Sequence, residues 1–178
     1  MLKVKTKRTR TRATSTPVPT VALPGFRVQA LPPDLEGDVR ELYRICHPKW
    51  PEPPGPHFFA YPTVVAIADY PHNVVGYAQY AMNLDDAGHI SVWLKDTCVA
   101  PEARGHGVAR ALMLERLRIG FEMGAVAALG MTQPENAPML GLLRSLHFDE
   151  REHFQHAYPA GEDGIFFGLS LATYRKGV

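Results

Sequence analysis

The stretch Cys98-Val-Ala-Pro-Glu-Ala-Arg-Gly-His-Gly-Val-Ala109 decides the fold of this chain. A strand-like run, His89–Val99, precedes it and stops at Pro101, which cannot donate to a strand ladder. A helical pattern over Arg104–Met123 follows, with apolar residues at helical spacing. The glycines between them allow close approach of the backbone to a ligand, and the unpaired N–H groups of a helix start attract anions. The stretch therefore predicts a cradle for a pyrophosphate.

Three other interpretations compete for the same residues. A strand-to-helix turn without a ligand is the commonest setting of a Gly-x-Gly pair. A Walker phosphate loop would need Gly-Lys-Ser/Thr after four spacer residues, and this sequence does not occur. A dinucleotide-binding unit would place its glycines after an early first strand, whereas here a run of three consecutive strand-like segments directly precedes them.

The order of the predicted elements favours a mixed, largely antiparallel sheet with helices on both faces, in an α+β, three-layer arrangement. Three consecutive strands come before a strand–helix–strand unit. The predicted strands are 26–31, 64–68, 74–82, 89–99, 125–131, 148–158 and 164–171, and the predicted helices are 33–46, 104–123 and a short one capped by Asn136. Residues 48–62 hold six prolines, and regular structure is not expected there.

Length and composition are those of one globular domain with a basic N-terminal arm. The chain has 178 residues, 46% of them hydrophobic and 21% charged, which excludes a disordered chain, a collagen and a coiled coil. No apolar run reaches the length of a membrane span. Residues 1–24 carry six Lys or Arg and no acid, so the formal charge of +1 is the sum of +6 on this arm and −5 on residues 25–178. A nucleic-acid partner for the arm is the weaker expectation, and a solvated tail is the stronger one.

The combined motifs over residues 26–171 resemble the GCN5-related N-acetyltransferase (GNAT) superfamily. Arg104-x-x-Gly107-x-Ala109 is similar to that family's Arg/Gln-x-x-Gly-x-Gly/Ala signature. Val74-Val75-Gly76, Asn136 at a helix start, and Leu146-His147-Phe148 in place of Leu-Gly-Phe also fit the pattern. The resemblance implies the acyl-CoA N-acyltransferase fold, with acetyl-CoA or another acyl-CoA as co-substrate and no metal.

The same resemblance implies roles for individual residues. The backbone amides of Arg104, Gly105, His106, Gly107, Val108 and Ala109 would hold the pyrophosphate of the cofactor. The backbone around Cys98, Val99 and Ala100 would pair with the pantetheine arm where two strands splay, and the Asn136 side chain would contact the cofactor. The N–H of Val99 would stabilise negative charge on the thioester oxygen. The acceptor would be a primary amine on a small molecule or a peptide.

The chain departs from the family pattern at the proton-transferring groups. Many family members have a Tyr where this chain has Leu143, so the usual acid for the leaving thiolate is missing; Tyr80 and Cys98 are substitutes by strand location only. Asp96, three residues before Val99, is the first choice for general base. A non-catalytic acyl-CoA-binding module of the same fold is therefore the alternative function.

Strand alternation assigns the residues around Asp96 to faces of the sheet. It places Ile90, Val92, Leu94, Asp96 and Cys98 on one face and His89, Ser91, Trp93, Lys95 and Thr97 on the other. His153 and His156 would point to opposite faces of their strand, so no metal pair is predicted.

The two cysteines, Cys46 and Cys98, are too few for a disulfide framework, and we expect reduced, buried thiols. Residues 1–22 lack the apolar core of a secretory signal, although their composition leaves a transit peptide open. A cytoplasmic monomer or homodimer is the expectation.

Overall fold

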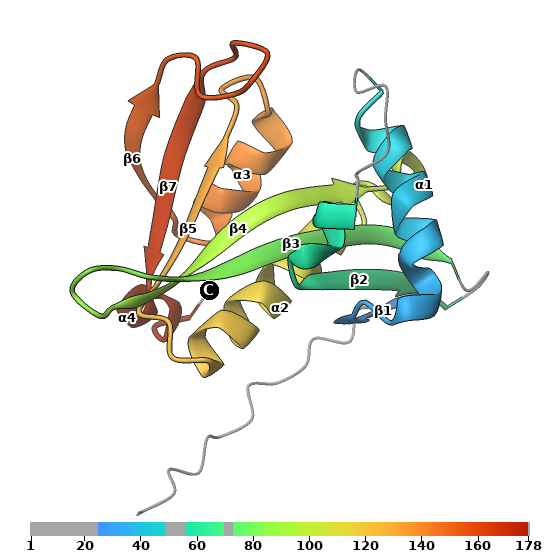
Figure 1. Cartoon of the computed structure of the whole chain (residues 1–178), viewed down its shortest axis with the longest axis horizontal. Coiled ribbons are helices and arrows are strands. Elements are labelled where there is room, and N and C mark those ends of the chain that lie inside the picture. Colours follow the sequence, from blue (N-terminus) through green and yellow to red (C-terminus); the bar gives the residue numbers. More distant parts are fainter. Residues whose placement is uncertain (1–24, 49–55, 70–72, 178) are drawn as a thin grey trace, which may run out of the picture.

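The protein is described by a computed structural model that covers residues 25–48, 56–69 and 73–177 (Figure 1). The predicted basic arm and part of the proline-rich segment lie outside these residues. The strands are β1 (Phe26–Ala30), β2 (Thr63–Ala68), β3 (Val74–Leu84), β4 (Ile90–Val99), β5 (Ala127–Thr132), β6 (Asp149–Phe154) and β7 (Gly164–Ser170). The helices are α1 (Glu36–Cys46), α2 (Val108–Glu122), α3 (Ala137–Ser145) and α4 (Leu171–Tyr174), with short 3-10 turns at η1 (Pro33–Leu35), η2 (Pro56–Ala60) and η3 (Pro101–Ala103).

Among the described residues, the strands form one seven-stranded sheet in the order β1-β2-β3-β4-β5-β7-β6. All neighbouring strands are antiparallel except β4 and β5, which are parallel. The helix α2 makes the crossover between these two strands, as a parallel connection requires. The predicted mixed, largely antiparallel sheet is therefore confirmed.

Helices cover both faces of the sheet, as predicted. Helix α1 packs on β3 and β4, and its buried residues Val39, Leu42 and Tyr43 join one hydrophobic cluster with Tyr77 and Cys98. Helix α2 packs on the other face, where Leu112, Met113 and Leu117 belong to a larger cluster that includes residues of α3 and β7. We call these two sides the α1 face and the α2 face. Figure 1 shows α1 over the β2–β4 part of the sheet and not over β5–β7.

Strands β4 and β5 pair over only part of their length and then separate. The parallel pairing joins Ser91–Leu94 to Ala127–Gly130, whereas β4 continues to Val99 and β5 to Thr132. The diverging strands are visible in Figure 1. The predicted splay is thus present, and it opens at the end of β4 that leads into the glycine-containing turn.

A β-bulge in β4 overturns the assignment of faces made from strict alternation. Ala78 pairs with Thr97 and Tyr80 with Leu94, so Lys95 and Asp96 together lie opposite Gln79. The extra residue exchanges the two faces: Leu94 packs in the cluster on the α2 face, whereas Cys98 packs under α1. Leu94 and Cys98 are therefore not on one face, because two residues of β4 occupy one step of the ladder.

Other boundaries also differ from those expected. The helix expected from Arg104 begins at Val108, because Gly105 and Gly107 both have positive φ values and keep the preceding residues in a turn. The proline-rich segment contains the short helix η2, although no regular structure was expected there. Strand β6 ends at Phe154, so His156 lies beyond it, and its φ of 50° marks a turn. None of the helices in the described ranges has the length and apolar character to cross a membrane.

Candidate active site

The turn between β4 and α2 has the geometry of an anion site. Gly105 and Gly107 have φ values of +78° and +83°, in the left-handed region that favours glycine. The first helical donor of α2 is the N–H of Ala111, which bonds to the carbonyl of Gly107, so the earlier amides belong to the helix start. The first turn of α2 carries no acidic side chain, and residues 104–107 are exposed. The turn thus presents N–H groups and the positive end of a helix dipole to solvent.

The backbone of Val99 faces the gap between β4 and β5. The N–H of Ala100 bonds to the carbonyl of Val75 on β3 at 2.9 Å, and Gly76 pairs with Val99. Because alternate residues of an antiparallel strand bond to one neighbour, the N–H and C=O of Val99 point away from β3. The Val99 carbonyl accepts a hydrogen bond from Arg104 Nε at 3.1 Å, which ties the strand end to the turn. Cys98 and Ala100 flank this position, and their backbones turn toward β3.

Asn136 caps helix α3 as predicted. Its side-chain oxygen accepts a hydrogen bond from the N–H of Met139 at 3.3 Å, and Pro138 follows in the first turn. The oxygen therefore has a structural role, while the side-chain NH₂ group is the part of Asn136 suited to a ligand. The contact of Asn136 with a cofactor stays a prediction.

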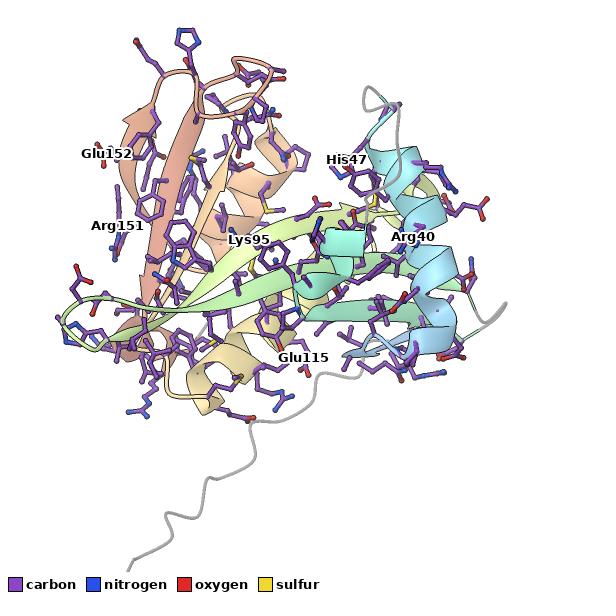
Figure 2. The ribbon with its side chains drawn as sticks, in the orientation of Figure 1. Arg40, His47, Lys95, Glu115, Arg151 and Glu152 are labelled. Atoms are coloured by element: carbon purple, nitrogen blue, oxygen red, sulfur yellow. A yellow bond between two sulfur atoms is a disulfide. The ribbon has the colours of Figure 1, made fainter. Side chains whose placement is uncertain are left out.

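Asp96 is the centre of a polar cluster on the α1 face. Its Oδ2 atom accepts a hydrogen bond from the Tyr77 hydroxyl at 2.5 Å and lies 3.1 Å from Nε2 of His47. Tyr77 on β3 is fully buried, whereas about a quarter of the His47 and Asp96 side chains is exposed. His47 directly follows α1, whose end is visible in Figure 2. The cluster thus joins groups from α1, β3 and β4 at a partly exposed position.

The cluster holds Asp96 in its ionised form. Burial raises the pKa of the Asp96 carboxyl, but hydrogen bonds from His47 and Tyr77 and the charge of His47 outweigh burial and lower the pKa below its usual value. For Tyr77, burial and the neighbouring Asp96 charge raise the pKa of the phenol, so the hydroxyl stays protonated. Tyr77 is therefore a fixed donor to Asp96 across the physiological range.

Cys46 and Cys98 form a disulfide, which corrects the expectation of two reduced thiols. Their sequence separation is 52 residues, and the bond joins the end of α1 to β4. The number of cysteines could not reveal this pair, because their proximity depends on how α1 packs across the sheet. A disulfide sulfur has no proton to donate, so in this state Cys98 cannot protonate a leaving thiolate.

Tyr80, the other proposed substitute for the missing acid, lies on the opposite face of the sheet from Asp96. Tyr80 packs in the cluster on the α2 face, and burial raises its pKa. Asp96 and Tyr77 lie on the α1 face, so Tyr80 is not part of their cluster. Leu143, at the position of the usual Tyr, is buried in α3.

A buried arginine lies beneath the bulge. Arg116 of α2 is fully buried and donates to the carbonyl of Gln79 at 3.0 Å, opposite Lys95 and Asp96. Burial lowers the pKa of Arg116 to about 9, partly offset by the charge of Asp96. The arginine thus supplies a donor for a strand carbonyl at the point where the bulge disturbs the ladder.

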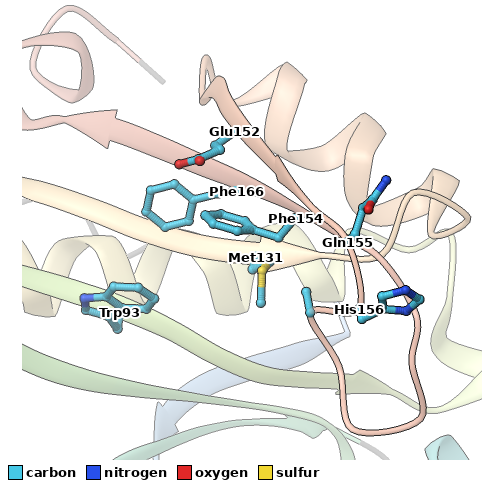
Figure 3. Close-up of a pocket in the computed structure, with 8 residues that line it drawn as sticks. Trp93, Met131, Glu152, Phe154, Gln155, His156 and Phe166 are labelled. Carbon is cyan, nitrogen blue, oxygen red and sulfur yellow. The ribbon is translucent and has the colours of Figure 1, made fainter.

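An apolar pocket lies on the α1 face of the sheet, over β4, β5, β6 and β7 (Figure 3). Its volume is about 490 Å³, and Glu152 is its carboxylate. Trp93 and Phe166 approach with ring centroids 5.8 Å apart, and Lys95 Nζ lies 5.7 Å from the centroid of Trp93. The lining residues are Trp93, Met131, Glu152, Phe154, Gln155, His156, Ala157 and Phe166. The segment 155–157 belongs to the connection between β6 and β7.

The sequence pointed to the glycine turn, Val99, Asn136 and Asp96, but it did not point to His47 or Tyr77 as site residues. The partner of His47, Asp96, is 49 residues away in the sequence, so no local pattern links the two. Tyr77 has the pattern of an ordinary buried strand residue, and no local signal marks its hydroxyl. Among the described residues, no group of three or more His, Cys, Asp and Glu side chains is arranged to hold a metal ion.

Comparison with solved structures shows the same fold in known acetyltransferases. The ribosomal-protein-S18-alanine N-acetyltransferase from Escherichia coli has a TM-score of 0.67 and 20% identity, over 82% of this chain and 94% of that one. Arabidopsis thaliana NAA60 in complex with acetyl-CoA has a TM-score of 0.73 and 14% identity, over 83% and 99%. Arabidopsis thaliana Naa50, in complex with the bisubstrate analogue CoA-Ac-MVNAL, has a TM-score of 0.69 and 15% identity, over 83% and 99%.

The search among curated proteins gives no sequence match. A family model, however, covers most of the domain: residues 37–148 match the model described as the acetyltransferase (GNAT) family. The matched range runs from α1 to the start of β6 and includes the bulged strand, the glycine turn and the capped helix α3. The chain therefore belongs to the GNAT acetyltransferase family.

Proposed function

We propose that this protein transfers an acetyl group from acetyl-CoA to a primary amine, by direct attack of the amine while both substrates are bound. The observation that carries the proposal is the glycine turn, whose exposed helix-start amides open beside the gap between β4 and β5. This arrangement fits a ligand with a pyrophosphate and an extended arm. The E. coli and A. thaliana acetyltransferases share the fold that surrounds it.

The residues that would hold the cofactor are those of the turn and of the adjoining strand. The amides of Arg104, Gly105, His106, Gly107, Val108 and Ala109 would bind the pyrophosphate. The backbone of Val99, flanked by Cys98, would bond to the pantetheine arm as an added strand does, and the Asn136 amide would contact the cofactor from α3. When bound, acetyl-CoA supplies an activated thioester, so the protein has mainly to position the amine.

The chain's own groups can then assist the transfer. The N–H of Val99 points into the gap, where it can stabilise negative charge on the thioester oxygen. Asp96 and its partner His47 form the group that can accept protons from the amine. The thiolate is a good leaving group at neutral pH, so the absence of a tyrosine at Leu143 slows the reaction rather than preventing it.

The acceptor that we propose is a small-molecule or peptide amine. A. thaliana Naa50 was solved with an analogue that carries the peptide MVNAL, which makes a peptide N-terminus the first class to test. The apolar pocket of Trp93, Met131 and Phe166 can bury an apolar group next to the amine. We propose that transfer needs neither a metal nor a membrane surface.

The test is binding of acetyl-CoA by calorimetry, followed by release of CoA over a panel of amines and peptides. We expect Gly107→Glu to abolish binding, because it places a side chain and a negative charge at a left-handed position in the anion site. Gly141→Glu is the matched control: it adds the same charge to an exposed position of α3 with no atom within 4 Å of the new Cβ.

Two outcomes would contradict the proposal in different ways. Wild-type protein that does not bind acetyl-CoA at about 1 mM, well above typical cofactor affinities, would exclude the acyl-CoA site. Binding without CoA release for any amine would instead support the alternative function, a non-catalytic acyl-CoA-binding module.

A further inference from the structure

The hydrogen bonds at Asp96 leave this carboxylate poorly suited to take a proton. Its Oδ2 atom already accepts from the Tyr77 hydroxyl at 2.5 Å and lies 3.1 Å from His47 Nε2. Both partners bond to the ionised form, and they keep the pKa of Asp96 below its usual value in spite of burial. A general base works best when its pKa lies near the working pH, and Asp96 is far from that condition at neutral pH.

The same contacts prepare His47 for this role. An ionised carboxylate only accepts hydrogen bonds, so Nε2 of His47 must carry the proton in the contact with Asp96. In that tautomer Nδ1 is the proton-accepting nitrogen. His47 is also the C-cap of α1, where the helix dipole favours a positive charge, and the Asp96 carboxylate would compensate the charge of an imidazolium.

The position of the pair is compatible with the reaction centre. Asp96 lies three residues before Val99, which corresponds to about 10 Å along a strand, a distance that a chain of about three water molecules can bridge. The side chains of His47 and Asp96 are 25% and 27% exposed, so water reaches them. Other ionisable groups around the pair are Tyr77 of β3, Tyr43 of α1, whose ring centroid is 4.3 Å from that of His47, and Arg116 of α2, whose charge interacts with Asp96 from the opposite face.

We propose that His47 accepts the proton of the acceptor amine through bridging water, and that Asp96 and Tyr77 are positioning residues that fix its tautomer and orientation. The proposal rests on the proposed acetyl transfer. In the step, the amine nitrogen forms the new C–N bond to the acetyl carbon, and the C–S bond breaks with its electron pair on sulfur. Of the two protons that the ammonium group loses, one passes to His47 and then to solvent, and the other ends on the sulfur.

The experiment compares pH profiles of kcat/KM for the wild-type protein, His47→Gln and Asp96→Asn, with two acceptors whose amines differ in basicity. An inflection that moves with the acceptor belongs to the amine, and one that stays belongs to the protein. We expect one inflection of the wild-type profile to belong to the protein. Glutamine can still donate a hydrogen bond to Asp96 but cannot take a proton, so His47→Gln should lose this inflection and about 10²- to 10⁴-fold in kcat/KM. Its affinity for acetyl-CoA should stay unchanged.

Asp96→Asn is expected to act differently from His47→Gln. It should lower kcat/KM but keep the protein inflection, because His47 can still take the proton while its orientation is no longer fixed by Asp96. His89→Gln is the control, since His89 also contacts an aspartate, Asp85, in the exposed turn between β3 and β4, and it should leave the profile unchanged.

The proposal is wrong if His47→Gln keeps the wild-type rate and profile while Asp96→Asn loses activity, because Asp96 would then take the proton itself. Nitrogen NMR of the wild-type imidazole gives a second measurement that needs no turnover. Neutral His47 with its proton on Nε2 would support the proposal, and the proton on Nδ1 would overturn it. A failure of the proposed function would appear elsewhere, as a wild-type protein without acetyl transfer.

Discussion

Gly120 is the residue at which helix α2 comes closest to the sheet. A Cβ atom added there would lie 2.6 Å from Cβ and Cγ1 of Val92, a distance that real Cβ atoms do not show. Val92 is fully buried on β4, so neither element can move away without opening the core. Gly120 therefore sets the distance between α2 and β4, the two elements that bracket the glycine turn.

We expect Gly120→Ala to destabilise the protein by about 1–3 kcal/mol through overpacking. Gly141→Ala in α3 is the control, because open space surrounds that position and alanine favours helix by about 0.5–1 kcal/mol. Urea unfolding of both variants measures the difference in the free energy of unfolding. Equal stability of the two variants would show that the contact between α2 and β4 relaxes at no cost.

At the scale of single residues, the sequence predicted the site only where a local signal exists. The left-handed glycines follow from Gly-x-Gly before a helix, and the cap at Asn136 follows from the proline two positions on. The partners of Asp96 carry no such signal, since His47 and Tyr77 reach it only through packing of α1 and pairing of β3. Long-range side-chain contacts of this kind cannot be found in one sequence.

At the scale of elements, the disulfide is the feature that ties α1 to the site. Cys46 precedes His47, and Cys98 lies between Asp96 and Val99, so the bond holds together the two segments that carry the proposed proton acceptor and the proposed oxyanion donor. The end of α1 is therefore fixed to β4 by a covalent bond as well as by the apolar contacts of Leu42 and Tyr43.

Breaking this bond should lower the stability of the fold. For a loop of 52 residues the expected loss is about 2–4 kcal/mol, largely because the unfolded chain gains freedom. The measurement is the melting temperature of the wild-type protein with and without a dithiol reductant, with the double variant Cys46→Ala/Cys98→Ala as the control that the reductant should not affect. Two free thiols in the untreated native protein would contradict the pairing.

The element order was predictable because periodicity and turn residues are local properties. Strict alternation failed within β4, since nothing in residues 90–99 marks Lys95 and Asp96 as sharing one step opposite Gln79. The start of α2 was placed four residues early because the apolar pattern does not register the positive φ of Gly105 and Gly107. Backbone geometry, rather than hydrophobicity, therefore determines both the side-chain faces of β4 and the first residue of α2.

At the scale of the whole molecule, charge divides the chain into two parts. Residues 1–24 carry a formal charge of +6 and residues 25–178 carry −5. The pyrophosphate of a cofactor would therefore be held by local amides of the glycine turn and not by an overall positive field.

Deleting residues 1–24 should leave acetyl-CoA binding unchanged, because the proposed cofactor site lies within residues 98–136. If the arm binds nucleic acid, the deletion should remove retention on DNA or RNA at low salt, and the retention of the full chain should fall steeply as salt rises. If the full chain and the chain without residues 1–24 are retained equally, the binding belongs to residues 25–178 and the arm does not bind nucleic acid. A loss of acetyl-CoA binding on deletion would contradict the division into arm and domain.

The bulge in β4 has a consequence for how this chain can vary. Before the bulge, Leu94 packs in the core under α2; after it, Cys98 packs in the core under α1. The extra residue shifts the alternation of side chains between the two faces of β4 by one position. Loss of Lys95 or Asp96 would leave a single residue opposite Gln79 and would keep Leu94 and Cys98 on their present faces, so the strand can lose the extra residue without exchanging the side chains that enter the two cores.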